Sequence, residues 1–304
     1  MRHYRFTDWI TQGFLAGVAL QMILVGWDSP RLWIWRVAGH VGAMVLIHGM
    51  ISRCEKCQVA GTFRWLRDFY PLLLYTVFYQ ETALMNQLIG RPRLDPQLMR
   101  LEHHLFGVQP SIVLMQKAPW AWVSEPLYAA YFSFYLMIAG WALWSWFRNR
   151  DIFHEFVAVV SFVFYGCYLL FMWIPAIGPR LMDVEGPERE LWMQLYPGQI
   201  YPSFPDAIRG GPCFQLMAWI YQNLEIGSAA IPSSHVAVAL TTLWFTWQHL
   251  RPLRGLHAGV VVLLCISTVY CRYHYAVDVV AGILAAVVLV PLAERAYRAS
   301  MSRS

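Results

Sequence analysis

Residues 272–297 read RYHYAVDVVAGILAAVVLVPLAERAY. This stretch joins a polar cluster of Arg272, His274 and Asp278 to an apolar run of the length that a membrane-spanning helix needs, roughly 20 residues. Polar groups are costly in membrane-embedded sequence unless they have a function, so the cluster is a candidate site. A second polar cluster, Pro232-Ser233-Ser234-His235, lies in the same apolar third of the chain.

The composition predicts an all-α integral membrane protein. The 304 residues are 58% hydrophobic, 16% aromatic and only 13% charged, whereas roughly 25% of residues are charged in an average soluble domain. Short basic loops separate the apolar stretches. We expect eight spans in a polytopic helical bundle, at about residues 9–27, 32–52, 69–89, 124–147, 154–176, 233–250, 256–272 and 275–297.

The basic residues predict the orientation of these spans. With a cytoplasmic N-terminus, eight spans place one group of basic residues inside: Arg2, Arg5, Arg53, Lys56, Arg64, Arg67, Arg148, Arg150, Arg251, Arg254, Arg295, Arg298 and Arg303. Both polar clusters then share the external face. The net charge of +5 reflects cytoplasmic anchoring, and no basic patch interleaved with aromatic residues indicates a nucleic-acid partner.

The spacing of His274 and Asp278 predicts a catalytic histidine. Residues four apart share one face of a helix, so the carboxylate is within reach of one ring nitrogen of His274. The other nitrogen is then available as a nucleophile or a base. The pair therefore predicts a catalytic site at the start of the last span.

The second cluster predicts an anion site beside this histidine. Pro232, Ser233 and Ser234 read as the capped first turn of a helix, whose unpaired N–H groups and positive dipole end favour an anion. Arg272 and Arg180 add planar guanidinium groups that match phosphate oxygens. With His235 as a second histidine, the set suits phosphoryl transfer through a phosphohistidine.

These motifs resemble the type 2 phosphatidic acid phosphatase superfamily, which joins a Pro-Ser-x-His motif to a distal His-x-x-x-Asp motif. Residues 272–282, with the segment from Leu94-Asp95-Pro96 through Leu105-Phe106-Gly107 to Gln109-Pro110, look most like the branch of inositol phosphorylceramide synthases and their bacterial relatives. The resemblance implies a six-helix phosphatase or phosphotransferase core within residues 69–297, with N-terminal transmembrane helices at 1–68 and a cytoplasmic tail at 298–304.

The resemblance also implies roles for site residues. His274 would be the nucleophile, Asp278 its orienting partner and His235 the acid that protonates the leaving oxygen. The substrate phosphate would be held by Arg180, Arg272, Ser233 and Ser234. The substrate would be a lipid phosphate or phospholipid, with no cofactor and no metal, among membrane lipids of a bacterial plasma membrane and with the site facing the periplasm or exterior.

Two departures from the superfamily pattern favour a transferase over a hydrolase. The lysine that precedes the first-motif arginine by seven residues is replaced by Trp173, and Arg272 lies two residues before His274 where the phosphatases have six. The acceptor would then be an alcohol instead of water. A lipid phosphate or polyprenyl pyrophosphate phosphatase remains an alternative.

A non-enzymatic alternative is a haem-binding transmembrane electron carrier, with His40 and His48 as candidate ligands. Two pairs of cysteines leave smaller possibilities open. Cys54 and Cys57 look like half a metal or redox motif, and Cys213 and Cys271 both lie near the predicted outer face, where a disulfide would form. The long external segment from Leu181 to Ile231, with an amphipathic run at Phe214 to Leu224, is predicted to be a lid that lies partly in the membrane interface.

Overall fold

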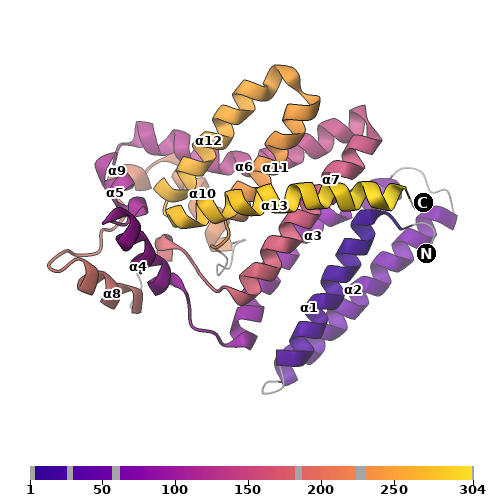
Figure 1. Cartoon of the computed structure of the whole chain (residues 1–304), viewed down its shortest axis with the longest axis horizontal. Helices are drawn as coiled ribbons and strands as arrows, with labels where there is room; N and C mark the ends of the chain where they lie inside the picture. The colour runs from indigo at the N-terminus through magenta and orange to yellow at the C-terminus, as the bar shows by residue number, and fades with distance from the viewer. Residues whose placement is uncertain (1–3, 26–29, 57–61, 182–186, 224–229, 303–304) are drawn as a thin grey trace.

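The computed structural model describes residues 4–25, 30–56, 62–181, 187–223 and 230–302. The regular structure in these ranges is helical throughout, as predicted (Figure 1). The α-helices are α1 (Phe6–Val25), α2 (Pro30–Lys56), α3 (Thr62–Ile89), α4 (Asp95–Phe106), α5 (Pro110–Lys117), α6 (Ala121–Arg148), α7 (Arg150–Trp173), α8 (Pro187–Leu195), α9 (Asp206–Arg209), α10 (Pro212–Asn223), α11 (Ser234–His249), α12 (Arg254–Tyr270) and α13 (Ala276–Met301). Short 3-10 turns lie at Pro179–Leu181 and Arg251–Leu253.

A helix occupies each of the eight predicted spans. Within the described ranges, six helical segments are long and apolar enough to cross a membrane by length and composition: Phe6–Val25, Trp33–Cys54, Ala121–Arg148, Arg150–Trp173, Arg251–Tyr270 and Ala276–Met301. The other two are α3, which carries Arg67, Asp68 and Glu81, and α11, which has 16 residues and therefore a length of about 24 Å at 1.5 Å per residue.

Helix α7 is the centre of the bundle. It packs against α1, α3, α6, α11 and α13. In its most apolar stretch of 18 residues, 72% of the residues are buried. A helix that is apolar on all sides is expected in such a position. Helices α1 and α2 lie along each other at one edge of the molecule (Figure 1) and meet the remaining bundle through α3 and α7.

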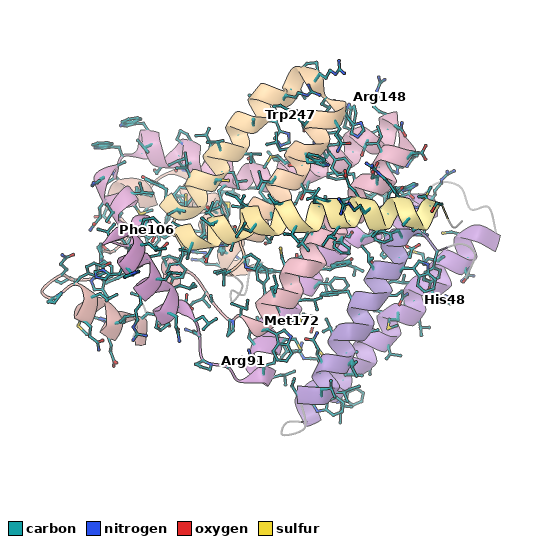
Figure 2. All side chains as sticks on the ribbon, viewed as in Figure 1. His48, Arg91, Phe106, Arg148, Met172 and Trp247 are labelled. Carbon is teal, nitrogen blue, oxygen red and sulfur yellow. The ribbon has the colours of Figure 1, made fainter. Side chains whose placement is uncertain are left out.

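Large apolar side chains cover much of the outer surface of this bundle. Trp35, Leu46 and Phe147 are each more than 70% exposed, and Trp247 is 52% exposed (Figure 2). Exposed apolar surface on this scale marks an interaction surface on a soluble protein, and on a bundle of long apolar helices it suits contact with lipid.

The short helices α4, α5, α8 and α9 gather at the end of the molecule opposite the two chain termini (Figure 1). The predicted external segment from Leu181 to Ile231 contains α8, α9 and α10. Its residues 182–186 and 224–229 lie outside the described ranges. The predicted amphipathic run corresponds to α10, which exposes Leu216 and Trp219 while burying Met217 and Ile220.

Candidate active site

The turn between α12 and α13 presents the predicted nucleophile. Helix α13 begins with a capping box in which a side-chain oxygen (Oδ2) of Asp278 accepts a hydrogen bond from the Tyr275 N–H at 2.9 Å. His274 therefore lies just before a capped helix start, and its own N–H donates to the carbonyl of Thr268 in α12 at 3.0 Å. Both sides of the turn are anchored, which holds His274 in one position.

The ring of His274 is oriented by two oxygens. Its Nδ1 lies 2.9 Å from the carbonyl oxygen of Ala230 and 3.5 Å from a carboxylate oxygen of Asp278. Because a backbone carbonyl can only accept, Nδ1 carries the proton in this contact and the neutral ring has an unprotonated Nε2. The predicted proximity of Asp278 is confirmed, and the structure adds Ala230 as the closer partner.

The second cluster lies at the start of α11, beside the start of α13. Ser233 is the N-cap of α11 and accepts from the Val236 N–H, and its own N–H donates to the Asp278 carbonyl at 3.1 Å. Ser234 is the first residue of the helix and is buried. The two helix N-termini, both predicted from sequence, are thus joined by a direct backbone hydrogen bond.

His235 and His274 face each other across this junction. Their ring centroids are 5.6 Å apart, with the ring planes inclined at 62°. The Nε2 of His235 lies 3.1 Å from the hydroxyl of Tyr131 on α6, and its ring also stacks on that tyrosine. A phosphoryl-transfer step needs a nucleophile and an acid close together, and these two rings are close enough to act on one substrate.

Arg180 lies against two tyrosine rings, one of which belongs to the residue before His274. Its guanidinium carbon is 4.3 Å from the ring centroid of Tyr221 and 5.3 Å from that of Tyr273. The turn that carries it depends on Gly178, which has a φ of 86° and approaches Tyr273 so closely that a Cβ would stand 2.4 Å from its carbonyl oxygen. Arg180 is thereby held beside the residue that precedes His274.

Arg272 is placed differently from the sequence expectation of an arginine directed at a phosphate. The residue is fully buried, and NH1 and NH2 of its guanidinium donate to the carbonyls of Pro202 and Ser203. Its guanidinium carbon also lies 4.6 Å from the ring centroid of Phe204. In this structure Arg272 ties the segment that holds Pro202 and Ser203 to the turn before His274, and its role as a phosphate ligand stays a prediction.

An aromatic stack that no sequence pattern predicted lies between Arg180 and His235. Tyr221 lies parallel to Tyr273 at 4.3 Å, Tyr273 stacks on Tyr131 at 4.4 Å, and Tyr131 stacks on His235 at 4.7 Å. Tyr273 adjoins the motif, but Tyr131 and Tyr221 lie in aromatic-rich segments and carry no pattern of their own. Only the packing of α6 and α10 brings them to the site.

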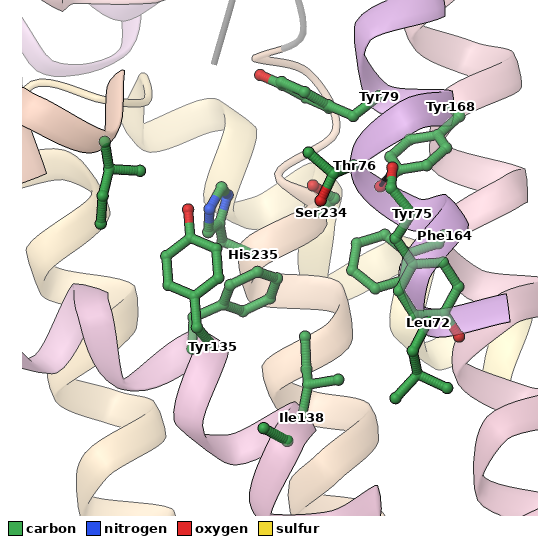
Figure 3. A pocket seen from close by; sticks show the side chains of 13 residues that line it. Leu72, Tyr75, Thr76, Tyr79, Tyr135, Ile138, Phe164, Tyr168, Ser234 and His235 are labelled. Carbon is green, nitrogen blue, oxygen red and sulfur yellow. Dashed lines mark hydrogen bonds between the residues drawn. The ribbon is translucent and has the colours of Figure 1, made fainter. Parts of the chain in front are cut away.

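A cavity of about 280 Å³ lies beside the site (Figure 3). Ser234 and His235 line one part of it, and side chains of α3, α6 and α7, with Ile220 of α10, line the remainder. The lining is mostly apolar and aromatic, and it includes Leu72, Tyr75, Tyr135, Ile138, Phe164 and Tyr168. A cavity of this composition suits an alkyl chain whose polar end reaches His235.

The remaining candidates from sequence are also placed. Nδ1 of His40 donates to the carbonyl of Arg36, and His48 contacts the Tyr4 hydroxyl. Cys213 and Cys271 are both free thiols. Cys57 lies outside the described residues. Within the described ranges, no group of three or more His, Cys, Asp or Glu side chains is arranged to hold a metal ion.

The fold and the site together define a class: an all-helical membrane protein in which two histidines and an aspartate meet at the N-termini of two neighbouring helices. A family comparison agrees with this description. The profile of the PAP2 superfamily matches residues 96–292, which is more than half of the chain, and the protein belongs to this superfamily. Searches of curated proteins and of solved structures each found no match. Membership supports a reaction of the phosphatase or phosphotransferase type.

Proposed function

We propose that the protein cleaves a lipid phosphoester through a phosphohistidine and transfers the phosphoryl group, or a phosphate with its head group, to an alcohol or to water. His274 is the nucleophile, Asp278 and the Ala230 carbonyl orient it, and His235 is the general acid and base. Arg180, Ser233 and Ser234 hold the phosphate, and Arg272 joins them by exchanging the Pro202 and Ser203 carbonyls for phosphate oxygens. The proposed site faces the outside of the cell, in the periplasm of a bacterium.

The observation that carries this proposal is the orientation of His274. Its Nδ1 donates to the Ala230 carbonyl at 2.9 Å, which leaves Nε2 with a free electron pair, and the ring of His235 lies 5.6 Å away. A nucleophile needs an unprotonated atom, and a leaving alkoxide needs a nearby acid. The pair supplies both.

The reaction then has two displacement steps. In the first, Nε2 of His274 attacks phosphorus, the bond from phosphorus to the lipid oxygen breaks, and His235 gives that oxygen a proton. In the second, neutral His235 takes the proton of the acceptor hydroxyl while its oxygen attacks phosphorus, and the bond from phosphorus to nitrogen breaks. His235 ends in its starting protonation state, so the cycle needs no external acid or base.

The cavity supports a lipid substrate. It extends from Ser234 and His235 between α3, α6 and α7, so a phosphate at the site would have an apolar and aromatic cavity beside it for a lipid chain (Figure 3). The departures at Trp173 and Arg272 support an alcohol acceptor, as in the inositol phosphorylceramide synthase-like branch. The chemistry of both steps is the same with water.

The experiment that tests this function is turnover by the purified protein in detergent. A panel of lipid phosphates, polyprenyl pyrophosphate and phospholipids is assayed with and without diacylglycerol, ceramide and inositol, following free phosphate and new phospholipid. Phosphate release without an acceptor identifies a phosphatase, and a product that needs the acceptor identifies a transferase. No turnover of any member of the panel would contradict the proposal.

A matched pair of histidine variants tests the nucleophile. We expect His274→Ala to abolish turnover and to abolish the phosphoenzyme that forms when the wild type is incubated with a substrate labelled in its phosphate. His104→Ala, at an exposed position of α4, should behave as wild type. The phosphoenzyme should be labile in acid and stable in base, as a phosphoramidate bond is. Turnover above background in well-folded His274→Ala protein would exclude this mechanism.

A further inference from the structure

Helix α4 buries acidic side chains among its apolar ones. Its buried stripe, Asp95, Leu98, Met99 and Glu102, includes two fully buried acids. Its exposed side is mixed and carries Arg100 and His104 as well as Leu105 and Phe106, which are each at least half exposed (Figure 2). A buried carboxylate costs considerable desolvation free energy unless it accepts hydrogen bonds, so the partners of these two acids define what α4 does.

Asp95 holds the turn that leads to Arg180. Its Oδ1 accepts from the Gly178 N–H at 2.9 Å, and both carboxylate oxygens lie within 3.2 Å of the Ile177 N–H. The same Oδ1 accepts from the Tyr275 hydroxyl at 3.1 Å. Asp95 therefore accepts hydrogen bonds both from the backbone segment that leads to Arg180 and from the residue that follows His274.

Glu102 holds the start of α13, two helical turns further along α4. Its Oε1 accepts from the Ala276 N–H at 2.5 Å and lies 3.4 Å from the Val277 N–H. These are among the first N–H groups of α13, which have no partner within their own helix. Asp278 lies in the same helical turn, so Glu102 fixes the backbone that aims Asp278 at His274.

The two bonded segments also touch each other. A Cβ added at Gly178 would stand 2.4 Å from the Tyr273 carbonyl oxygen, which means that the Arg180 turn and the His274 turn are in direct backbone contact. A shift of either segment is therefore passed to the other. Helix α4 contacts both of them from one side.

We propose that Asp95 and Glu102 are positioning residues for the proposed reaction, so that α4 clamps the phosphate-binding turn and the nucleophile turn at catalytic separation. This inference rests on the proposed function of the same site. Neither acid is assigned contact with the substrate, and each acts through backbone N–H groups that flank the reacting side chains. A misplacement of about 1 Å by a remote substitution can lower a rate about 100-fold.

The decisive comparison is between truncation and a replacement that keeps the accepting oxygen. We expect Glu102→Ala to lower kcat about 100-fold with a KM within about 3-fold of wild type, because the nucleophile turn moves while the phosphate ligands remain. Glu102→Gln keeps a carbonyl oxygen for the Ala276 and Val277 N–H groups, and should retain kcat within about 5-fold. Glu190→Ala, at an exposed acid of α8, is the matched control and should behave as wild type.

Asp95 should show a different kinetic pattern. Asp95→Ala releases the turn that carries Arg180, so we expect a KM about 10-fold higher in addition to a lower kcat. Asp95→Asn keeps Oδ1 for Gly178 and Tyr275 but turns an amide toward the Ile177 N–H, and should fall between Asp95→Ala and wild type. Tyr275→Phe removes a single hydroxyl and should lower kcat several-fold, which gives a test with little risk to folding.

A second readout separates this inference from the proposed function. Carbethoxylation of His274 by diethyl pyrocarbonate, measured by mass spectrometry, reports the access and nucleophilicity of its ring without any substrate. We expect its rate to change at least 3-fold in Glu102→Ala and to be restored in Glu102→Gln. Unchanged kcat and unchanged carbethoxylation in folded Glu102→Ala and Tyr275→Phe proteins would overturn the clamp. An inactive wild type with the expected carbethoxylation changes would overturn only the proposed function.

Discussion

Gly282 on α13 lies against the backbone of Ser233 at the start of α11, so closely that a Cβ at position 282 would stand 2.6 Å from the Ser233 carbonyl oxygen. That distance is shorter than real Cβ contacts allow, and the atom it meets is backbone. The contact is one helical turn from Asp278, whose carbonyl accepts the Ser233 N–H. Gly282 therefore sets how near the two histidine-bearing helix starts can come.

A side chain at position 282 should separate the two motifs. We expect Gly282→Val to lower kcat at least 100-fold because α11 and α13 must move apart, which lengthens the distance between His235 and His274. Gly140→Val is the matched control, since a Cβ at Gly140 meets no atom within 4 Å. Turnover of each variant on the substrate found for the wild type is the measurement. Equal activity of the two variants would show that this close approach does not determine the catalytic geometry.

The hydroxyl of Tyr131 should tune His235. It lies 3.1 Å from Nε2 of His235, and the ring stacks on the same histidine. Tyr131→Phe keeps the stacking and removes the hydrogen bonds of this hydroxyl to His235 and to the Tyr221 hydroxyl. We therefore expect kcat to fall about 10-fold with little change in KM, which is a modest share of the effect of general acid catalysis. Tyr297→Phe, near the far end of α13, is the control. A shift in the pH profile of kcat would accompany the loss, and an unchanged profile with unchanged kcat would contradict the assignment.

Glu102 should make the stability of the protein depend on pH. Burial is the main cause that raises the pKa of its carboxyl from 4.5 to about 7, and the nearby Asp278 adds to the shift. Between pH 4.5 and about 7 the folded protein holds a proton that the unfolded chain releases, so the free energy of unfolding falls as the pH rises over this range and levels off above it. We expect Glu102→Gln to be more stable than wild type by about 3 kcal/mol above pH 8, with the difference vanishing near pH 4. Thermal unfolding of both proteins in one detergent across this pH range checks the sign.

Asp8 and Arg67 should bind the N-terminal helix to the bundle. Both side chains are buried, NH1 of Arg67 lies 2.7 Å from Oδ1 of Asp8, and the Tyr70 hydroxyl donates to the same oxygen. Removing one partner leaves a buried charge, so Arg67→Ala should destabilise the protein by about 3–5 kcal/mol. Asp8→Ala combined with Arg67→Ala should recover part of this loss, and thermal unfolding in detergent is the measurement. Additive effects of the two substitutions would show that the pair is not coupled.

Metal removal should leave the rate unchanged. In the proposed mechanism the positive charge at the phosphate comes from Arg180, from the N-terminus of α11, and from Arg272 once it has left the Pro202 and Ser203 carbonyls. Electrostatic stabilisation by such groups can replace a divalent ion. Turnover measured before and after EDTA treatment, with Mg²⁺ added back, checks this. A rate that falls with EDTA and returns with Mg²⁺ would require a different account of the phosphate site.

The sequence by itself determined the helical membrane architecture and the centre of the site. Apolar runs of bilayer length predict helices whatever their neighbours are, and helices occupy all eight predicted segments. The pairing of His274 with Asp278 could also be predicted, because residues four apart on a helix meet by local geometry alone. The capped start of α11 is a local feature for the same reason.

The tertiary structure decided what surrounds that centre. Three groups around this centre come from distant parts of the chain: the Ala230 carbonyl beside His274, the α4 carboxylates that accept from the Gly178 and Ala276 N–H groups, and Tyr131 beside His235. No periodicity or spacing reports such contacts, because they depend on how whole helices pack. Packing also turned Arg272 toward the Pro202 and Ser203 carbonyls, where sequence alone predicted a phosphate ligand. Local spacing thus specifies the candidate residues, and long-range packing specifies their orientation.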